Sequence, residues 1–500
     1  MSIAASSKPK PTNSTQPKIA VIGGGVAGMA AAIRMAAKGF QVHLYEAGQE
    51  LGGKLSDQQL GGFRFDNGPS LFTLPELLEE LFQSAGRQLS DYLAYEQLEL
   101  VCRYYYPDGS KIDAWADPQR FADEIEKVTA VPAKRVMQYL RRAGFMYETT
   151  TPVFLEKSLH KLANYLNWPT IRGIARLPML GVFQRMHDFN LTWLKEKRVV
   201  QLFDRFATYN GSDPYQAPAT LIQISHIEHQ KGAWYPRGGM IAIRNALHRL
   251  LEDLDVSIHL NSPVSALAVK ARRIVGLHQA DKVHTYDKVI FAGDIHQVYE
   301  RLLPGNTSPK KLEKKELSTS ALIFHWGVKG SYPTLDLHNI FFSEDYRQEF
   351  DALAAGKLPD EATIYVYVSS KHNPIDAPAG HENWFVMINT PADSGQDWQQ
   401  LAVKQRALII SRLSKVLKPD IAENIVTESF TTPLHLAGRT GSAGGAIYGR
   451  ASNNKFSAFL RHPNYSSRIK GLYFCGGSVH PGGGIPLCLH SARIVEDLIG

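Results

Sequence analysis

Three glycines near the amino end of the chain have the spacing that binds a dinucleotide. Gly23, Gly25 and Gly28 form the pattern GxGxxG directly after a short apolar run. The first glycine permits a tight turn, the second lets the backbone approach a pyrophosphate, and the third lets a helix pack closely on a strand. Glu46 follows about 20 residues later, where an acidic side chain hydrogen-bonds ribose hydroxyls. The pattern therefore predicts a nucleotide cofactor.

A second glycine pair lies just beyond this acidic residue. Gly52 and Gly53 permit close approach of the backbone to a ligand, and Lys54 adds a positive charge beside them. The segment 46–54 (EAGQELGGK) resembles the second signature of the glutathione-reductase-like flavoproteins, which implies FAD rather than NAD. That family usually has Arg where this chain has Lys54, and Lys keeps the charge but loses the bidentate fork.

The run 66–70 (DNGPS) is a further candidate for contact with the cofactor. Gly68, Pro69 and Ser70 favour a tight turn whose backbone lies close to a ring system. The sequence contains no GxSxG nucleophile elbow, which excludes the simplest kind of hydrolase. It also has no second GxGxxG after a strand, so a separate nicotinamide-binding domain is not expected.

The elements that must position these glycines form an α/β pattern. Residues 18–23 (KIAVIG) predict a buried parallel strand, 26–38 predict a helix and 41–46 a second strand, which together make a βαβ unit. The last thirty residues predict a strand, a glycine-dense loop and a helix that starts near Gly484.

The length of the chain predicts at least two domains, because 500 residues exceed the size at which one core stops growing. We expect a cofactor-binding domain and a discontinuous substrate domain with a helical insertion. The cofactor-binding segments are 18–75, 235–300 and 435–500, and the substrate segments are 76–234 and 301–434.

Composition and charge limit the class of protein further. With 44% hydrophobic and 21% charged residues the chain is of ordinary globular composition. A net charge of +7 attracts anionic lipid, a phosphate-bearing cofactor or nucleic acid, but no nucleic-acid module is present, so no nucleic-acid partner is expected. Three cysteines without a CxxC pair argue against disulfides and zinc and favour a reducing cytoplasm.

Two segments of the sequence indicate where in the cell the protein works. Residues 1–17 lack an apolar core and are expected to be a disordered tail, not a signal peptide. Basic and aromatic residues mix at about 150–200, which is the composition of an interfacial membrane anchor. The alternative is a lid helix packed on the protein's own core. Because no apolar run reaches about 20 residues, any membrane contact is expected at the surface.

Five stretches carry a resemblance to one family. They resemble the bacterial carotenoid desaturases, the phytoene desaturase family, and within it are most similar to the hydroxycarotenoid 3,4-desaturases. The resemblance covers nearly everything after the tail and weakens at about 110–200. The stretches are SVHPGGGIPL from Ser478, ATYNGSDPYQAPATL from Ala207, WYPRGGM from Trp234, HNIFFSEDY from His338 and APAGHENWFVMINTP from Ala377.

The resemblance implies an α/β, FAD-binding Rossmann-like fold of the glutathione-reductase type, with a discontinuous substrate domain and a helical membrane-facing insertion. Val264 stands where the family's backbone contacts adenine, and amides near Gly484 are expected to face the flavin's pyrimidine carbonyl. Asp294 lies in FAGD, whereas the family commonly has Asn-Ala-Asp. The residues implied to bind FAD are Gly23, Gly25, Gly28, Glu46, Gly52, Gly53, Lys54, Val264, Asp294 and, in the loop 476–486, Gly476, Gly477, Gly484, Ile485 and Pro486.

The activity that the resemblance implies is desaturation of a CH–CH bond, in which the flavin takes a hydride and the adjacent carbon loses a proton. The expected substrate is an acyclic carotenoid, with 3,4-desaturation of a 1-hydroxycarotenoid end favoured. Such a hydrocarbon is selected by tunnel length and shape, with a polar end group bound by one or two side chains. Oxygen or a quinone is the expected electron acceptor, and the expected location is the cytoplasm, at the inner face of a membrane.

The catalytic residues stay open at this point. His480 in the glycine loop and Glu148 in the helical region are weak candidates for the proton acceptor. His226 and His229 lack a third ligand, so no metal is expected. The alternative activities are phytoene-type desaturation, carotenoid isomerisation and amine oxidation. A lipid-binding escort on the same fold is the non-enzymatic alternative, against which the intact glycines and Glu46 argue.

Overall fold

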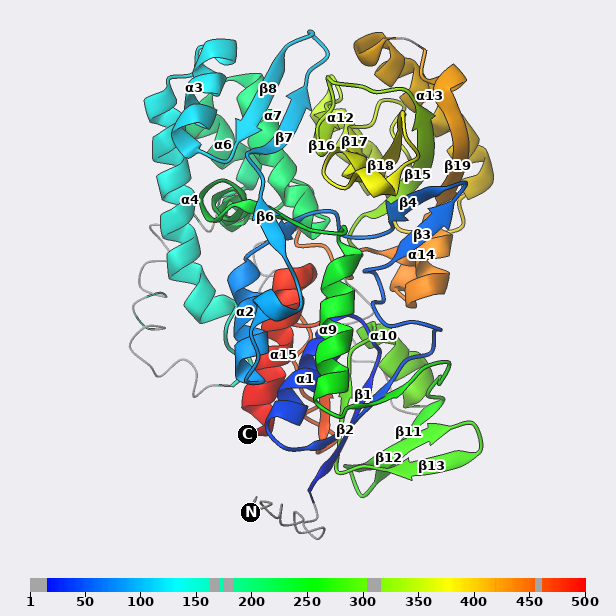
Figure 1. Ribbon diagram of the computed structural model, residues 1–500. Helices are drawn as coiled ribbons and strands as arrows, with labels where there is room; N and C mark the ends of the chain where they lie inside the picture. The colour runs from blue at the N-terminus through cyan, green and yellow to red at the C-terminus, as the bar shows by residue number, and fades with distance from the viewer. Residues whose placement is uncertain are drawn as a thin grey trace, which may run out of the picture.

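The computed structural model describes residues 16–161, 171, 173, 181, 184–303, 316–418, 420–454 and 461–500. The predicted tail lies almost wholly outside these residues, as does part of the predicted membrane-contact segment. Figure 1 shows two halves, each built on its own sheet. No helix within the described ranges combines the length and the hydropathy that crossing a bilayer requires.

A five-stranded parallel sheet forms the centre of the lower half (Figure 1). Its middle strand is buried on both faces, as central strands of parallel sheets are. Ile19 and Val21 pack on one side, Ala20 and Ile22 on the other, because successive side chains of a strand alternate. The order is β10 (Ser257–His259), β2 (Gln41–Tyr45), β1 (Lys18–Ile22), β14 (Lys288–Phe291), β20 (Leu472–Phe474).

Helices cover one face of this sheet and a β-meander covers the other. The buried guanidinium of Arg34 pairs with Glu496 at 2.8 Å and with Glu80, which ties three helices together. The helices are α1 (Val26–Ala37), α2 (Pro75–Ser84), α9 (Ile241–Asp253) and α15 (Ile485–Ile499), and the meander strands are β11 (Ala266–Lys270), β12 (Arg273–Gln279) and β13 (Lys282–Thr285).

The upper half is built on a seven-stranded mixed sheet (Figure 1). Its order is β19 (Ile425–Thr431), β15 (Ser320–Lys329), β18 (His381–Thr390), β17 (Ile364–Tyr367), β16 (His338–Phe341), β7 (Leu100–Tyr105), β8 (Lys111–Trp115). The largest apolar core joins this sheet to a helical layer. That layer contains α3 (Pro118–Thr129), α4 (Ala133–Phe154), α6 (Met186–Leu194), α7 (Lys197–Asp204) and α12 (Tyr346–Ala354).

Shorter elements connect the two halves. They are β3 (Asp57–Leu60), β4 (Phe63–Asp66), β5 (Phe72–Thr73), β6 (Tyr95–Gln97), β9 (Ala233–Pro236), α8 (Gln223–His226), α10 (Ile295–Gln297) and α14 (Pro433–Thr440). The helix α13 (Trp398–Leu417) packs on the far side of the upper sheet.

The predicted βαβ unit is confirmed to within a residue or two, since β1, α1 and β2 occupy the predicted places. The terminal helix begins at Ile485, one residue after Gly484. The sequence analysis missed β7 and β8. The run of β7 is buried at almost every position and lacks the alternation of an exposed strand, so its pattern gave no strand signal.

Our first prediction concerns Gly28, where a Cβ would lie 1.9 Å from the carbonyl oxygen of Gly23. Gly28→Ala is expected to push α1 off β1 and to lower the free energy of unfolding by about 1–3 kcal/mol or more. Exposed Gly438 in α14 has nothing within 4 Å of such a Cβ, so Gly438→Ala is the control. It is expected to stabilise by about 0.4–1 kcal/mol. Urea titration measures both, and equal effects would contradict the prediction.

Candidate functional site

The two glycine turns lie directly against each other. The amide of Gly52 donates to the carbonyl of Gly24 at 2.8 Å, and a Cβ on Gly53 would lie 3.2 Å from Cα of Gly25. Helix α1 begins after Gly25 without a side-chain cap, so its first amides have no intrahelical partner. Such amides and the helix dipole attract an anion, which suits the approach to a pyrophosphate predicted for Gly25.

Glu46 joins the first turn to the strand end. One carboxylate oxygen accepts from the amide of Gly24 at 2.7 Å and the other from Gly48 at 2.8 Å. A carboxylate has lone pairs beyond these two, so ribose hydroxyls can still bind it. The segment that carries Val264 lies alongside, because the amide of Ser262 donates to the carbonyl of Glu46 at 2.8 Å. Val264 is thus placed near the predicted adenosine end.

Lys54 connects the second turn to a distant segment. Its ammonium donates to the carbonyl of Ala446 at 3.3 Å and to that of Ile447, and burial lowers its pKa while the charge of Asp294 opposes that shift. The bidentate fork that Lys lacks is therefore replaced by contacts to backbone carbonyls. Contact of Lys54 with phosphate or flavin stays a prediction.

The turn at 68–70 packs on this lysine. A Cβ on Gly68 would lie 1.8 Å from the carbonyl oxygen of Lys54, so only glycine fits there. The hydroxyl of Ser70 lies 2.6 Å from the phenol oxygen of Tyr365. The turn therefore bridges the second glycine turn and the upper sheet, and its contact with the ring system stays a prediction.

The carboxyl-terminal loop closes the site from the other side. The amide of Gly476 donates to the hydroxyl of Ser491 at 3.1 Å, and Gly484 takes a φ of +107° immediately before α15. A Cβ on Gly484 would meet nothing within 4 Å, so the start of α15 faces open space. The unpaired amides at this helix start, that of Ile485 among them, suit the predicted contact with a carbonyl of the flavin, whereas Pro486 has no N–H to donate and fixes only the backbone there.

Asp294 caps the short helix α10. Its carboxylate accepts from the amide of His296 at 3.0 Å and lies 3.0 Å from the same residue's imidazole nitrogen. Burial raises the pKa of Asp294, but these hydrogen bonds and the charges of His296 and Lys54 outweigh burial and lower it overall. Asp294 is therefore an anion that helps balance the buried charge of Lys54.

Two further side chains beside the carboxyl-terminal loop were not predicted from the sequence. Burial raises the pKa of Tyr448 to about 12 and that of Cys488 to about 11, and both residues are partly accessible. The ring of Tyr448 packs on Gly483, where a Cβ would come within 2.8 Å of it. Cys488 lies in the first turn of α15, and its place after the glycine loop was the one signal for it.

His480 holds the carboxyl-terminal glycine loop against the segment that carries Lys157. Its Nε2 lies 3.1 Å from the carbonyl oxygen of Lys157, and burial lowers its pKa to about 3. A general base works best with a pKa near the operating pH, so this imidazole is poorly suited to accept a proton. Glu148 is exposed on α4. Neither residue joins the group around Lys54, and no catalytic base is assigned.

The two histidines weighed as metal ligands have other partners. His226 Nδ1 contacts the side-chain oxygen of Gln230, and the ring of His229 stacks on Phe121 with centroids 4.4 Å apart. Across the described ranges, no group of three or more His, Cys, Asp or Glu side chains could hold a metal ion.

The predicted cofactor fits this arrangement. Amides for a pyrophosphate after Gly25, a carboxylate for ribose at Glu46 and an uncapped helix start for the pyrimidine ring at Gly484 come from three segments of the chain. Close backbone approach is secured where any side chain would collide, at Gly28, Gly52 and Gly68. These residues would hold FAD; the individual assignments stay predictions.

Our second prediction concerns pH. His480 has a folded pKa of about 3 against an ordinary value of 6.5, so between these values the unfolded chain binds more protons. Its contribution is complete above pH 6.5 and is lost as the pH falls toward 3, at up to about 1.4 kcal/mol per pH unit. His480→Gln keeps an amide donor for Lys157 and is expected to reduce the pH slope of the unfolding free energy by that amount. An unchanged slope between pH 6 and 4 would contradict the prediction.

Comparison with known proteins identifies the family. The profile described as flavin containing amine oxidoreductase matches residues 26–495. A 1-hydroxycarotenoid 3,4-desaturase of Flavobacterium sp. (strain P99-3) is 43% identical, over 96% of this chain and 99% of that protein. A 4,4'-diapolycopene oxygenase of Methylomonas sp is 32% identical, over 96% of this chain and 98% of that protein.

Solved structures share the fold. An oxidoreductase from Methanosarcina mazei aligns with a TM-score of 0.66 at 14% identity, over 96% of this chain and 100% of that one. Wild-type putrescine oxidase bound to putrescine aligns with a TM-score of 0.64 at 12% identity, over 97% of this chain and 99% of that one. The predicted α/β flavoprotein fold is thereby confirmed, and FAD is the cofactor that the family uses. The chain belongs to the flavin-containing amine oxidoreductase family, in its carotenoid desaturase branch.

Proposed function

We propose that this chain is an FAD-dependent desaturase that introduces the 3,4 double bond into an acyclic carotenoid with a hydroxyl at C1. The observation that carries the proposal is the 43% identity to a 1-hydroxycarotenoid 3,4-desaturase over nearly the full length of both chains. The geometry around Gly25, Glu46, Lys54 and Gly484 supports it, because an escort without redox chemistry has no need of these contacts.

The reaction removes a hydride from one carbon of the substrate and a proton from its neighbour, and the electron pair left behind forms the new π bond. Bound FAD supplies the hydride acceptor. The residues of this protein would bind the cofactor and the substrate and orient them relative to each other. The glycine turns and Glu46 would hold the nucleotide end, and the partial positive charge at the start of α15 would favour negative charge on a carbonyl of the ring.

Apolar side chains of the upper half would exclude water from the reacting bond. Leu71, Met387 and Ile447 are partly buried against the core of that half; Leu71 follows the turn at 68–70, Met387 pairs with Tyr365, and the carbonyl of Ile447 accepts from Lys54. A hydrocarbon bound along them gains about 25 cal/mol for each Å² removed from water. Oxygen or a quinone is our proposed final electron acceptor, since a quinone shares the membrane with the substrate.

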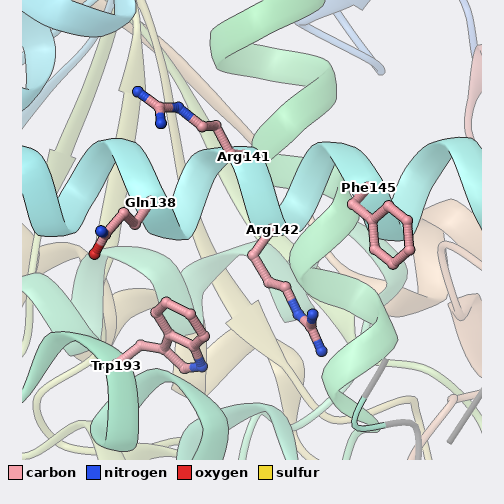
Figure 2. Close-up of a pocket in the computed structure, with 5 residues that line it drawn as sticks. All are labelled: Gln138, Arg141, Arg142, Phe145 and Trp193. Atoms are coloured by element: carbon pink, nitrogen blue, oxygen red, sulfur yellow. The ribbon is translucent and has the colours of Figure 1, made fainter. Parts of the chain in front are cut away.

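We also propose that the chain works in the cytoplasm at the inner face of a membrane, from which an insoluble polyene must be taken. Figure 2 shows a shallow pocket beside α4, lined by Gln138, Arg141, Arg142, Phe145 and Trp193. Arg142 and Phe145 extend toward the side where Trp193 of α6 lies. Guanidinium groups beside aromatic rings suit the interface of an anionic bilayer.

Our third prediction tests this surface. Arg141→Glu reverses the exposed charge at the pocket rim and is expected to weaken binding to vesicles that contain an anionic lipid, because one basic residue near such a surface contributes about 1 kcal/mol. Co-sedimentation measures the bound fraction. Lys415→Glu on α13, on the opposite side of the upper half, makes the same charge change and is expected to bind as the wild type does. Equal loss in both variants would contradict the prediction.

Our fourth prediction tests the activity. Purified, FAD-loaded protein is incubated in liposomes with a 1-hydroxylated acyclic carotenoid, with the same polyene lacking the hydroxyl, and with a phytoene-type precursor that has fewer conjugated double bonds. Chromatography is expected to show a product two hydrogens lighter from the hydroxylated substrate, with a longer conjugated system. Products only from the precursor would favour a phytoene-type desaturase. An isomer of equal mass, an oxygenated product, turnover of amines, or protein that never binds flavin would each contradict the proposal.

A further inference from the structure

The proposed reaction places the substrate's hydroxyl close to the reacting bond. The oxygen on C1 is three bonds from C3, so with bonds of about 1.5 Å it lies within about 4 Å of that carbon. A hydrogen bond adds about 2.8 Å. Side chains that bind this hydroxyl must therefore project into the space beside the flavin, and they cannot lie at the far end of a long tunnel.

Among the described residues, one series of hydrogen-bonded polar side chains begins in the turn that is predicted to lie beside the flavin. The hydroxyl of Ser70 lies 2.6 Å from the phenol oxygen of Tyr365, which lies 2.8 Å from Nδ1 of His338. Ser70 belongs to the turn that packs on Lys54, whereas Tyr365 and His338 come from the neighbouring strands β17 and β16. The chain of groups thus starts at the predicted flavin side and runs into the substrate half.

The imidazole of His338 has a hydrogen-bond partner at only one of its two nitrogens. His338 is 4% exposed, and its Nε2 has no hydrogen-bond partner. Burial, together with the charges of His372 and Arg205, lowers the pKa of His338 to about 3, and burial also raises the pKa of Tyr365. Both side chains are therefore neutral at physiological pH, and a neutral imidazole has one donor and one acceptor nitrogen.

The positions of the hydrogens on Ser70, Tyr365 and His338 determine which donors and acceptors these side chains can offer to a ligand. If Tyr365 donates to His338, then Ser70 donates to Tyr365 and its oxygen keeps free lone pairs. If His338 donates instead, Tyr365 donates to Ser70, whose own hydrogen is left free. In both arrangements Ser70 has bonding capacity for one more hydroxyl, which is itself both donor and acceptor.

Apolar side chains pack beside these groups, while the charges of Arg205 and Glu228 act on Tyr365 from the neighbouring polar cluster. Tyr365 keeps partial exposure although burial strongly perturbs its phenol, and it packs on the same core as Leu71, Met387 and Ile447. A hydroxyl in such a place gains a hydrogen bond from Ser70 or Tyr365. A polyene without a hydroxyl leaves that bonding capacity unmet.

We propose that Ser70 and Tyr365, supported by His338, bind the C1 hydroxyl and so position C3 and C4 beside the flavin. We call these three side chains the hydroxyl site. The inference rests on the proposed function, and it assigns to that function the residues that determine its specificity. Ser70 then has two roles, since its backbone belongs to the turn at the cofactor and its side chain faces the substrate.

Our fifth prediction tests the hydroxyl site by binding as well as by turnover. Quenching of tryptophan fluorescence measures Kd for the hydroxylated polyene and for its analogue without the hydroxyl, and product formation gives kcat/KM for both. The wild type is expected to bind the hydroxylated polyene about 10- to 100-fold more tightly. Tyr365→Phe and Ser70→Ala are expected to bring the two Kd values together, whereas Ser70→Thr retains a hydroxyl and is expected to keep the preference.

The control is Tyr139→Phe, which removes a buried phenol bonded to Asn190 at 2.7 Å and is expected to leave the preference unchanged. Equal Kd values in the wild type, or a full preference retained by Tyr365→Phe, would overturn the inference. If the wild type desaturates neither polyene but its binding preference disappears in Tyr365→Phe, the hydroxyl site stands and the proposed function fails.

Discussion

Contact between two glycine turns is the constraint on which the site depends. The bond from Gly52 to Gly24 and the close approach of Gly53 to Gly25 bring two backbones together without side chains between them. A Cβ on Gly53 would press on Gly25 at the start of α1, whose first amides have no intrahelical partner, and a Cβ on Gly52 would collide with the carbonyl of Leu55 within the second turn. Packing of helix on strand at Gly28 has the same origin, so fold and cofactor site share one steric condition.

The buried ammonium of Lys54 connects the two glycine turns to a distant segment of the chain. Lys54 follows the second turn directly, so its backbone is fixed by the glycines, while its ammonium binds carbonyls almost four hundred residues away. Removing a charge from water is costly, and here the nearby anion Asp294 and two carbonyl acceptors offset that cost. The amino-terminal and carboxyl-terminal parts of the cofactor domain are thereby held in one arrangement.

Sequence alone predicted the parts whose cause is local. The βαβ unit and the start of α15 follow from glycine spacing and apolar runs of few residues, whereas the cofactor contacts of Gly23 to Gly28 stay predictions. What could not be predicted depends on contacts between distant segments. The partners of Lys54 lie on a loop without a motif, and the meeting of Ser70 with Tyr365 needs strand pairing that no short pattern encodes. His480 and Glu148 were candidates by residue type, and only burial and exposure separated them from the site.

Selectivity for a long hydrocarbon has to come from few groups, because one methylene in an apolar pocket changes discrimination only by about 10- to 200-fold, whereas an unmet buried hydrogen bond can change it far more. The upper half contains a second buried polar cluster, in which Arg205 donates to Tyr104 at 2.8 Å and to Tyr209 at 3.1 Å and lies 3.5 Å from Glu228. The charges of Arg205 and Glu228 are paired with each other, so the cluster stabilises the core of the upper half and its electrostatic field is constant. The hydroxyl site differs because its groups are neutral and Ser70 has capacity to spare. When a hydroxyl leaves neutral groups, no buried charge is left without a partner. The hydroxyl site can therefore release its substrate after each turnover and bind the next one.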